Sequence, residues 1–520
     1  MSGEPVRSLV IVGAGTAGWL AAVLARGRLD PGTSICAVVS DETSPIGVGE
    51  GTTGFFTDAI LDPRSGIDEA QFLAEAGGTL KLGIQHSGWR ADGGSYWGPI
   101  DNPYRHLGSL ARLDVPILEA AFCAEGRAIA DAYLHTPLMA ACRGPVLEID
   151  GERGLSRSYA YHFDAGKAGA FLQRVAVSRG VERIVGHVVT VERREDGTVT
   201  AVLLRDGRRI EGDFFIDCSG GARVVRGRDS AYVRYDDVLP VDTAVVAQVP
   251  HRSGSLPPFT RAIALRSGWA WEIPTADRLG VGYVHASAFL DPEGAAEEVR
   301  QALGIGDVPM RTLRFSSGRL VEPWSENCVA VGLAAGFLEP LEATSLHATL
   351  IELELLLDAL ARGRQGEPSV RARFNMIFGD AMDAFRDFIL LHYRGGRTDT
   401  LFWRAMHAGA PPARVAGWAD RWARAFPRRS DVLTGSGAIG LGLILPVAGG
   451  LGLLGPGTAQ RAFAEVMGAV TPGSIVQRHL DITARLAATA LDHAAALGVL
   501  RRGAPVAVAS RLDEIHEPWQ

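Results

Sequence analysis

Lysine is almost missing from this chain of 520 residues. It occurs only at Lys81 and Lys167, so arginine supplies nearly all of the 52 basic residues. The 59 acidic residues outnumber them and give the chain a net charge of −7. Phosphate binding requires a basic face, so this balance argues against nucleic acid as an obligatory partner.

Cysteine is also sparse, and its spacing argues against two kinds of site. The five residues are scattered, and no two of them have the CxxC spacing: Cys36, Cys123, Cys142, Cys218 and Cys328. An odd, dispersed set argues against a disulfide framework and against a zinc site. We therefore expect no metal and a reducing, cytoplasmic location. The apolar run at residues 9–12 is too short, and too soon followed by glycines, for a signal peptide.

Charge is absent from residues 432–460. These 29 positions are enough to span a membrane. However, nine of them are glycine, and Pro446 and Pro456 would interrupt a continuous helix. The composition therefore favours a buried, glycine-rich segment of the fold over a membrane span.

The start of the chain has the pattern of a strand, a glycine turn and a helix. Residues 9–12 are apolar, Gly13, Gly15 and Gly18 follow, and a helical run continues to residue 26. In this motif the first glycine permits the tight turn, the second lets the backbone approach a pyrophosphate, and the third allows close helix–strand packing. The free N–H groups at the start of the helix favour an anion. The pattern predicts a dinucleotide site in an α/β fold.

Later segments extend this prediction. Residues 185–193 and 199–204 alternate around an Asp-Gly turn and predict a β-hairpin, and residues 210–218 predict another strand. Helical periodicity dominates the second half, at residues 346–362, 382–393 and 475–497.

Four segments resemble, in order along the chain, the motifs of the flavin-dependent tryptophan halogenases. Residues 46–52 (IGVGEGT) resemble the strap between the flavin and substrate sites, and residues 80–84 (LKLGI) the catalytic-lysine segment. Residues 268–274 (GWAWEIP) match the WxWxIP signature. Residues 337–345 (FLEPLEATS) resemble the stretch that holds the catalytic glutamate and the halide site. Four motifs in family order are far more specific than any one of them.

The resemblance implies a para-hydroxybenzoate-hydroxylase-like FAD-binding fold, α/β (α+β) in class, with a mostly helical substrate-binding subdomain. Residues 217–220 and 327–336 are similar to the later FAD segments of that fold. The implied FAD module comprises residues 1–90 and 155–350, and the subdomain residues 91–154 and 351–520. The implied FAD contacts are Gly13, Gly15, Thr16, Ala17, Gly18, Val39, Val48, Gly49, Glu50, Gly51, Val188, Asp217, Gly332 and Leu333.

The resemblance also implies the catalytic roles. FAD, reduced to FADH2 by a separate flavin reductase, would use O2 and chloride to supply hypochlorous acid, and Lys81 would carry the oxidised halogen to the substrate. A lysine amine can become neutral and bind chlorine, whereas guanidinium stays protonated, which explains a lysine in an arginine-rich chain. Glu342 would be the acid–base partner, with the halide at Thr344 and Ser345, although Glu342 could equally be a carboxylate at a helix start.

Two tryptophans of the signature, Trp269 and Trp271, would guard the flavin so that substrate cannot reach it directly. The alternative is that a pair at i and i+2 forms one face of a core strand.

Three departures from the family bear on cofactor and substrate. The second strand usually ends in an acidic residue that holds the ribose, but here Val39 stands at that place. Trp97, Pro99 and Ile100 occupy the place of the His-x-Phe clamp of free-tryptophan members, and the tyrosine pair that grips the amino acid is not found. Together with Glu342, these three residues are the predicted substrate contacts. The losses favour a tryptophan within a peptide, as in the lantibiotic-type peptide-tryptophan halogenases, or another hydrophobic indole.

We therefore predict a halogenase that chlorinates such an indole for natural-product biosynthesis, with a homodimer as one candidate assembly. The main alternative is a flavin monooxygenase that hydroxylates an aromatic or hydrophobic substrate. It would share the FAD motifs but would not need WxWxIP or Lys81. A second alternative is a flavin-binding scaffold without catalysis, associated with a membrane through residues 432–460.

Overall fold

The computed structural model describes residues 5–42, 50–101, 103, 113–149, 152–156, 158–252, 256–432, 434–503 and 507–508. The chain forms two compact units, and it enters each of them three times. The first unit comprises Met1–Gly78, Phe163–Asp237 and Ser316–Asp383, and the second comprises Thr79–His162, Val238–Phe315 and Ala384–Gln520. The mixed α/β class predicted from the sequence is confirmed. The predicted division into a cofactor module and a substrate subdomain stays a prediction.

The first unit is built on a six-stranded sheet of order β10-β2-β1-β14-β23-β22. Its strands are β1 (Ser8–Val12), β2 (Ser34–Val39), β10 (Glu182–Val185), β14 (Phe214–Asp217), β22 (Trp324–Ser325) and β23 (Cys328–Ala330). All pairings are parallel except that of β22 with β23. The central strands read as continuous apolar runs because a parallel sheet is buried on both faces. Their side chains form a core that includes Val10, Val38 and Phe215.

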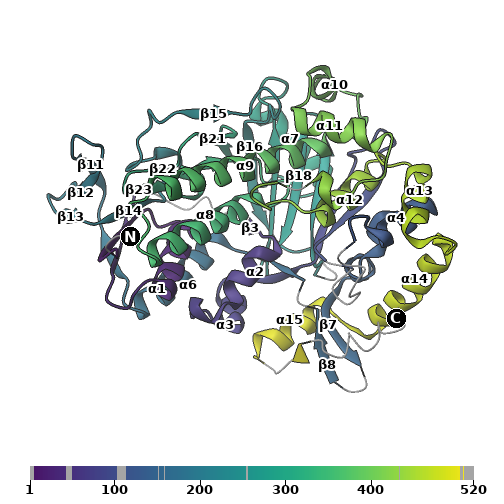
Figure 1. The fold of residues 1–520 in the computed structure, drawn as a ribbon, viewed down its shortest axis with the longest axis horizontal. Coiled ribbons are helices and arrows are strands. Elements are labelled where there is room, and N and C mark those ends of the chain that lie inside the picture. The colour runs from purple at the N-terminus through teal and green to yellow at the C-terminus, as the bar shows by residue number, and fades with distance from the viewer. Residues whose placement is uncertain are drawn as a thin grey trace. The chain divides into compact units, whose positions relative to one another are not determined.

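Helices pack against this sheet, and small sheets flank it. α1 (Thr16–Arg28) contacts both α6 (Ala165–Ser178) and α8 (Thr344–Ala361), and Figure 1 shows α1, α6 and α8 close together. The other elements of the unit are α2 (Gly54–Leu61), α3 (Glu69–Glu75), β3 (Glu50–Gly51), β11 (Val188–Arg193), β12 (Val199–Leu204), β13 (Arg209–Glu211), β15 (Tyr232–Arg234), β21 (Gly318–Leu320) and β24 (Gly336–Phe337).

The predicted hairpin is confirmed as the β11–β12 pair. Gly197 has φ +87°, which the turn requires, and the Asp196 carboxylate accepts the Thr198 N–H. The single strand predicted at residues 210–218 is wrong. The segment forms two strands that belong to different sheets, since β13 pairs with β12 whereas β14 pairs with β1 and β23.

The second unit is built on a seven-stranded sheet of order β20-β16-β19-β18-β17-β5-β6. Its strands are β5 (Gly83–Ser87), β6 (Ser95–Pro99), β16 (Thr243–Val249), β17 (Phe259–Leu265), β18 (Gly268–Pro274), β19 (Leu279–His285) and β20 (Arg311–Arg314). Every pairing is antiparallel except β17 with β5. Helix α7 (Pro292–Leu303) packs on β16 and β19 through Ala295 and Val299.

Short strands and many helices complete the second unit. The strands are β4 (Thr79–Lys81), β7 (Arg143–Ile149), β8 (Glu152–Leu155), β9 (Ala160–Phe163), β25 (Ala490–Asp492) and β26 (Ala507–Val508). The helices are α4 (Ile117–Ala124), α5 (His135–Ala140), α10 (Leu401–Ala408), α11 (Ala413–Trp422), α12 (Leu441–Gly450), α13 (Pro456–Met467), α14 (Pro472–Thr489) and α15 (His493–Arg501), while α9 (Pro368–His392) runs from the first unit into the second.

Two helix predictions need correction, and one is confirmed. The predicted helix at 346–362 is confirmed as α8. The run at 382–393 is the end of the longer α9. The predicted helix at 475–497 is interrupted, because Ala490–Asp492 forms β25 against β7, and the Asp492 carboxylate then caps α15 by accepting the Ala495 N–H.

The uncharged segment is a glycine-rich part of the fold that is buried in its centre, at Leu441 and Ile444–Ala448, whereas Gly435, Gly437 and Gly440 are exposed. It contains α12, which packs on β6, and the start of α13. A Cβ at Gly450 would overlap the ring of Tyr96, and one at Gly449 would lie 2.8 Å from Cδ1 of Ile129. The glycines therefore allow the helix to approach its neighbours closely. Across the described residues, no helix is both long and apolar enough to cross a membrane.

Candidate active site

The glycine turn of the first unit has the geometry of a dinucleotide cradle. Gly13 has φ +111°, and its N–H donates to the Val38 carbonyl at 2.9 Å. A Cβ at Gly13 would overlap the carbonyl of Cys218, and one at Gly18 would overlap the carbonyl of Gly13. Both positions therefore require glycine, one for the turn and one for the packing of α1 on β1.

Gly15 has a different role, because nothing lies within 4 Å of the place where its Cβ would be. It is the N-cap of α1, and no side chain caps the N–H groups of Thr16 and Ala17 that follow. Free N–H groups next to open space form the anion-binding end of a helix. Gly332, with φ +65°, brings the later segment next to this end, since a Cβ there would lie 3.0 Å from that of Ala17. This cradle fits the pyrophosphate of FAD.

We expect Gly15→Val to weaken FAD binding at least about tenfold without loss of fold. The backbone of Gly15 (φ −71°) suits any residue, and nothing lies within 4 Å of the new Cβ, so we expect the side chain to obstruct an approaching ligand rather than the fold. Quenching of flavin fluorescence on titration measures the affinity. Gly169→Val is the matched control, because Gly169 lies on α6 and also has open space at its Cβ. Equal FAD affinity in both variants would contradict this cradle.

The other predicted FAD residues of the first unit are placed as follows. Asp217 is fully buried, and its carboxylate accepts N–H groups of Ser219, Val225 and Arg226. It thus holds the loop after β14. Likewise, Glu352 of α8 accepts the Gly332 N–H at 2.7 Å and so fixes the backbone at Gly332 and the half-exposed Leu333.

Val39 is a buried residue at the end of β2 and offers no carboxylate for a ribose. Of the two acidic residues after it, Glu42 pairs with Arg205, and Asp41 pairs with Arg183 at 3.5 Å. Both carboxylates at this place thus have an arginine partner.

The strap and the hairpin contribute the remaining predicted contacts. Val48 and Gly49 lie outside the described residues, whereas Glu50 and Gly51 form β3. Burial raises the pKa of Glu50 to about 7. Val188 at the start of β11 packs against the sheet core. All of these cofactor assignments stay predictions.

The predicted halide segment forms the start of α8. Ala343 is the N-cap and has φ +55°, a left-handed conformation that is rare for alanine and turns the chain sharply after Glu342. Thr344 and Ser345, the first two helical residues, line a small pocket together with Phe337 and Met382. The Oγ1 atom of Thr344 is buried and has no hydrogen-bond partner. An unsatisfied hydroxyl at an uncapped helix start suits a small anion.

Lys81 lies in the second unit and is buried, with only 1% of its surface exposed. It ends β4, which pairs antiparallel with β9 so that Lys81 stands opposite Ala160. The next residue, Leu82, accepts the Ile100 N–H through its carbonyl at 2.7 Å. A buried lysine is rare, because burial opposes the charged form of the amine. The predicted substrate residue Ile100 is thus bonded to the residue that follows Lys81 in the chain.

Of the other predicted substrate residues, Trp97 and Pro99 lie on β6, the edge strand of the sheet, whereas Glu342 precedes α8 in the first unit. Pro99 is buried, and Trp97 is half-buried with its ring edge-on to Phe259 at 5.0 Å. An edge strand with a half-buried indole offers apolar surface and no charged group for an amino acid backbone.

Trp269 and Trp271 are both buried on β18, with ring centroids 5.8 Å apart. Trp271 lies flat against Gly282 of β19, where a Cβ would overlap the indole. The neighbouring Glu272 pairs with Arg252 and Arg261. Burial fits the core-strand alternative and the flavin-guarding role alike, so the latter stays a prediction.

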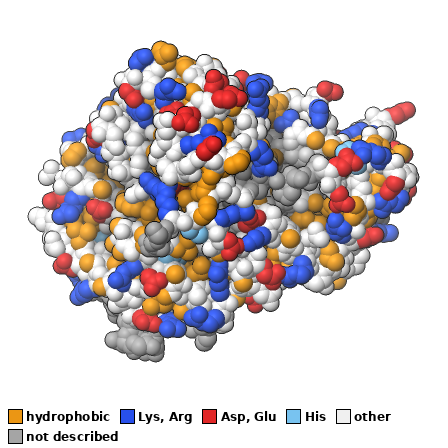
Figure 2. Space-filling model, turned by 180° about the vertical axis from the view of Figure 1, so that it is seen from behind, with side chains coloured by type: hydrophobic (Ala, Val, Ile, Leu, Met, Phe, Trp, Pro, Cys, Tyr) orange, Lys and Arg blue, Asp and Glu red, His pale blue; other side chains and the backbone are white. Residues whose placement is uncertain are grey.

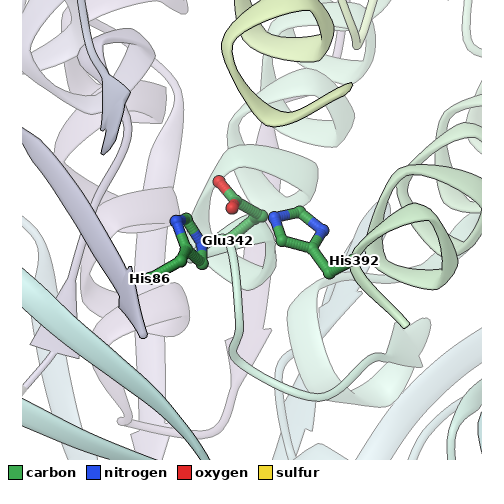
Figure 3. Close-up of side chains that lie close together, drawn as sticks. All are labelled: His86, Glu342 and His392. Atoms are coloured by element: carbon green, nitrogen blue, oxygen red, sulfur yellow. The ribbon is translucent and has the colours of Figure 1, made fainter. Parts of the chain in front are cut away.

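Sequence reasoning missed a group of buried histidines in the second unit. His86 of β5 and His392 of α9 lie with ring centroids 4.9 Å apart, and Figure 3 shows the two rings beside each other. Glu342, labelled in the same figure, belongs to the first unit. His162 and His493 lie next to β4. Isolated histidines in apolar runs carry no sequence signal for this grouping.

The charges of the surface are mixed. On the face shown in Figure 2, described Lys and Arg side chains are interspersed with Asp and Glu. This distribution matches the nearly balanced composition.

Comparisons with known proteins agree with the motifs. Residues 8–436 match the family model of the tryptophan halogenases. The chain is 31% identical over 504 residues to the tryptophan 6-halogenase SttH of Streptomyces toxytricini, a match that covers 88% of this chain and 94% of that one.

Two solved structures extend the match. Xcc4156, a flavin-dependent halogenase from Xanthomonas campestris, is 30% identical with a TM-score of 0.81 and covers 97% of this chain and 100% of its own. MibH, a lathipeptide tryptophan 5-halogenase, is 28% identical with a TM-score of 0.79 and covers 96% and 94%. The chain therefore belongs to the tryptophan halogenase family, flavin-dependent enzymes with an FAD-binding fold, and the predicted resemblance is confirmed.

Proposed function

We propose that this chain is an FADH2-dependent halogenase that chlorinates a tryptophan indole, preferring an indole within a peptide or another hydrophobic compound to free tryptophan. The observation that carries the proposal is Lys81, a buried amine beside the predicted substrate strand in a chain that otherwise uses arginine. A separate flavin reductase is the proposed source of reduced flavin.

The residues of the first unit bind the reagents in this proposal. The cradle of Gly13, Gly15 and Gly18 holds the cofactor, and the start of α8 holds chloride at Thr344 and Ser345. Bound reduced FAD, with dioxygen and chloride, supplies hypochlorous acid. The start of α8 favours chloride because its N–H groups carry a partial positive charge.

Lys81 then controls the oxidised halogen. Its neutral amine takes chlorine from hypochlorous acid and releases water, or its protonated form donates a hydrogen bond to the acid. Chlorine passes as an electrophile to a ring carbon of the indole, and the carboxylate of Glu342 accepts the proton that the ring loses. Orientation of the indole relative to Lys81 selects the carbon.

The substrate preference rests on what the second unit offers. Trp97 and Ile100 are partly exposed and apolar. In this proposal they take the place of the clamp with which free-tryptophan members hold the amino acid. The sequence likeness does not decide between substrates, because the lathipeptide halogenase MibH and the tryptophan 6-halogenase SttH are each 28% identical to this chain in the structural comparison.

We expect a tryptophan-containing peptide to be chlorinated with a kcat/KM at least about tenfold higher than free tryptophan. Product mass after incubation with a flavin reductase, NADH and chloride measures both. The control peptide has phenylalanine in place of tryptophan. Efficient turnover of free tryptophan would contradict the substrate preference. A hydroxylated product that forms equally without chloride would instead support the monooxygenase alternative.

A further inference from the structure

Strand β4, which ends at Lys81, is only three residues long and is contacted by two buried histidines. His162 of β9 contacts the side chain of Thr79, and His493 at the start of α15 contacts the backbone of Leu80. Both imidazoles are almost completely buried. The two residues before Lys81 thus each have one histidine partner.

The protonation state of His493 follows from its two hydrogen bonds. Its Nδ1 lies 3.0 Å from the carbonyl oxygen of Leu256, which can only accept, so Nδ1 carries the proton. Its Nε2 is then bare and accepts the Leu80 N–H at 3.1 Å. Burial lowers the pKa of His493 to about 4, which keeps the ring neutral. A second proton, on Nε2 of His493, would point at the Leu80 N–H, and two donors cannot bond to each other.

His162 takes part in a series of hydrogen bonds in which each donor and each acceptor can be assigned. The Thr79 hydroxyl donates to the Pro274 carbonyl at 2.6 Å, so it accepts from Nδ1 of His162 at 3.3 Å. Nε2 of His162 then accepts the hydroxyl of Thr260 at 2.9 Å. This series of hydrogen bonds connects β17, β9, β4 and the end of β18, which is the strand that carries Trp269 and Trp271.

Neither imidazole adds a positive charge next to Lys81, because both rings are neutral. Burial, then the charges of Lys81 and His493, lower the pKa of His162 well below its usual range. The loss of either ring would leave a buried donor or acceptor unsatisfied beside β4. On β4 the groups affected belong to Thr79 and Leu80, the two residues before Lys81, and the others are the Leu256 carbonyl and the Thr260 hydroxyl.

We propose that His493 and His162 are positioning residues that fix the backbone of β4 and thereby the amine of Lys81, an inference that rests on the function proposed for Lys81. His493 lies beyond residues 8–436, the part that matches the family model. The C-terminal segment therefore completes the support of the lysine, through a contact across 413 positions of sequence.

The test compares three variants of the full chain. His493→Leu removes both hydrogen bonds, and His493→Gln keeps an amide that can accept from Leu80. His479→Leu is the matched control, because His479 is a buried histidine of the same unit that bonds the Ala132 carbonyl and packs edge-on to Phe122 of α4. The measurements are kcat and KM for the halogenated product, the fraction of oxidised FADH2 that appears as product, and Tm.

We expect His493→Leu to lower kcat and the product fraction at least tenfold relative to His479→Leu at a similar loss of Tm. KM should change less than threefold, and His493→Gln should restore kcat to within about threefold of the parent. If His493→Leu and His479→Leu lower kcat equally, or if kcat does not recover in His493→Gln, the positioning role is wrong. Failure of the proposed function would differ, since the parent protein would then make no halogenated product.

Discussion

Replacing Lys81 with methionine should lower kcat for halogenation by at least about a thousandfold, the scale of loss when a group that handles the reacting atom is removed. Methionine keeps the unbranched, apolar stem in the buried position at the end of β4 but cannot bind or activate the halogen. Oxidation of reduced flavin should continue, because the cradle lies in the other unit. Product mass and oxygen consumption together measure this separation.

The only other lysine supplies the matched control. Lys167 is exposed on α6, so Lys167→Met should leave the halogenation rate within about twofold of the parent. Lys81→Arg adds a second comparison, because guanidinium keeps the charge but stays protonated. If Lys81→Met kept more than a tenth of the parent activity, Lys81 would not be the residue that carries the halogen.

Glu342→Gln should lower kcat roughly 100-fold, within the range that a positioned general base contributes. The amide has the size of the carboxylate but cannot accept the proton that the ring loses. Loss of that proton should then limit the rate, so deuterium at the reacting ring carbon should slow the variant and leave the parent nearly unaffected. Rates with both isotopic forms of the substrate measure this effect.

Glu322→Gln is the control for this experiment, because Glu322 is an exposed carboxylate of the same unit. It should behave as the parent. A Glu342→Gln variant with a lower rate but no isotope effect would indicate that Glu342 shapes the turn before α8 and does not act as the base. A full loss of chloride dependence would place its role at the halide pocket.

The local features of the fold were predictable from the sequence. The apolar runs of β1 and β14, the glycines of the turn and the Asp196-Gly197 hairpin act over a few residues, where period and turn chemistry decide the structure. Gly13 and Gly18 could be assigned because steric contacts within the motif require them. The motif could not show that Asp217 binds three N–H groups of its own loop.

Pairing between distant segments was not predictable in this way. The sheet of the second unit joins β5 and β6, near residue 90, to strands beyond residue 240, and no local pattern encodes that register. His493 and Leu80 are a clear instance, because each lies in an ordinary apolar run. The interruption of the predicted helix at 475–497 has the same cause, since β25 forms only where β7 is present to pair with it.

The close contact between Trp271 and Gly282 has a consequence for recognising members of this family from their sequences. Trp271 stands directly opposite Gly282 in the β18–β19 pair, and a methyl group at position 282 would occupy the space of the indole. A chain could keep every residue of the WxWxIP signature and still not accommodate the indole of its second tryptophan. This would happen if a residue larger than glycine stood opposite that tryptophan on the neighbouring strand. The position of the tryptophan and the position opposite it on the next strand must therefore be compared together. Gly282, which no motif includes, decides whether Trp271 can pack as it does here.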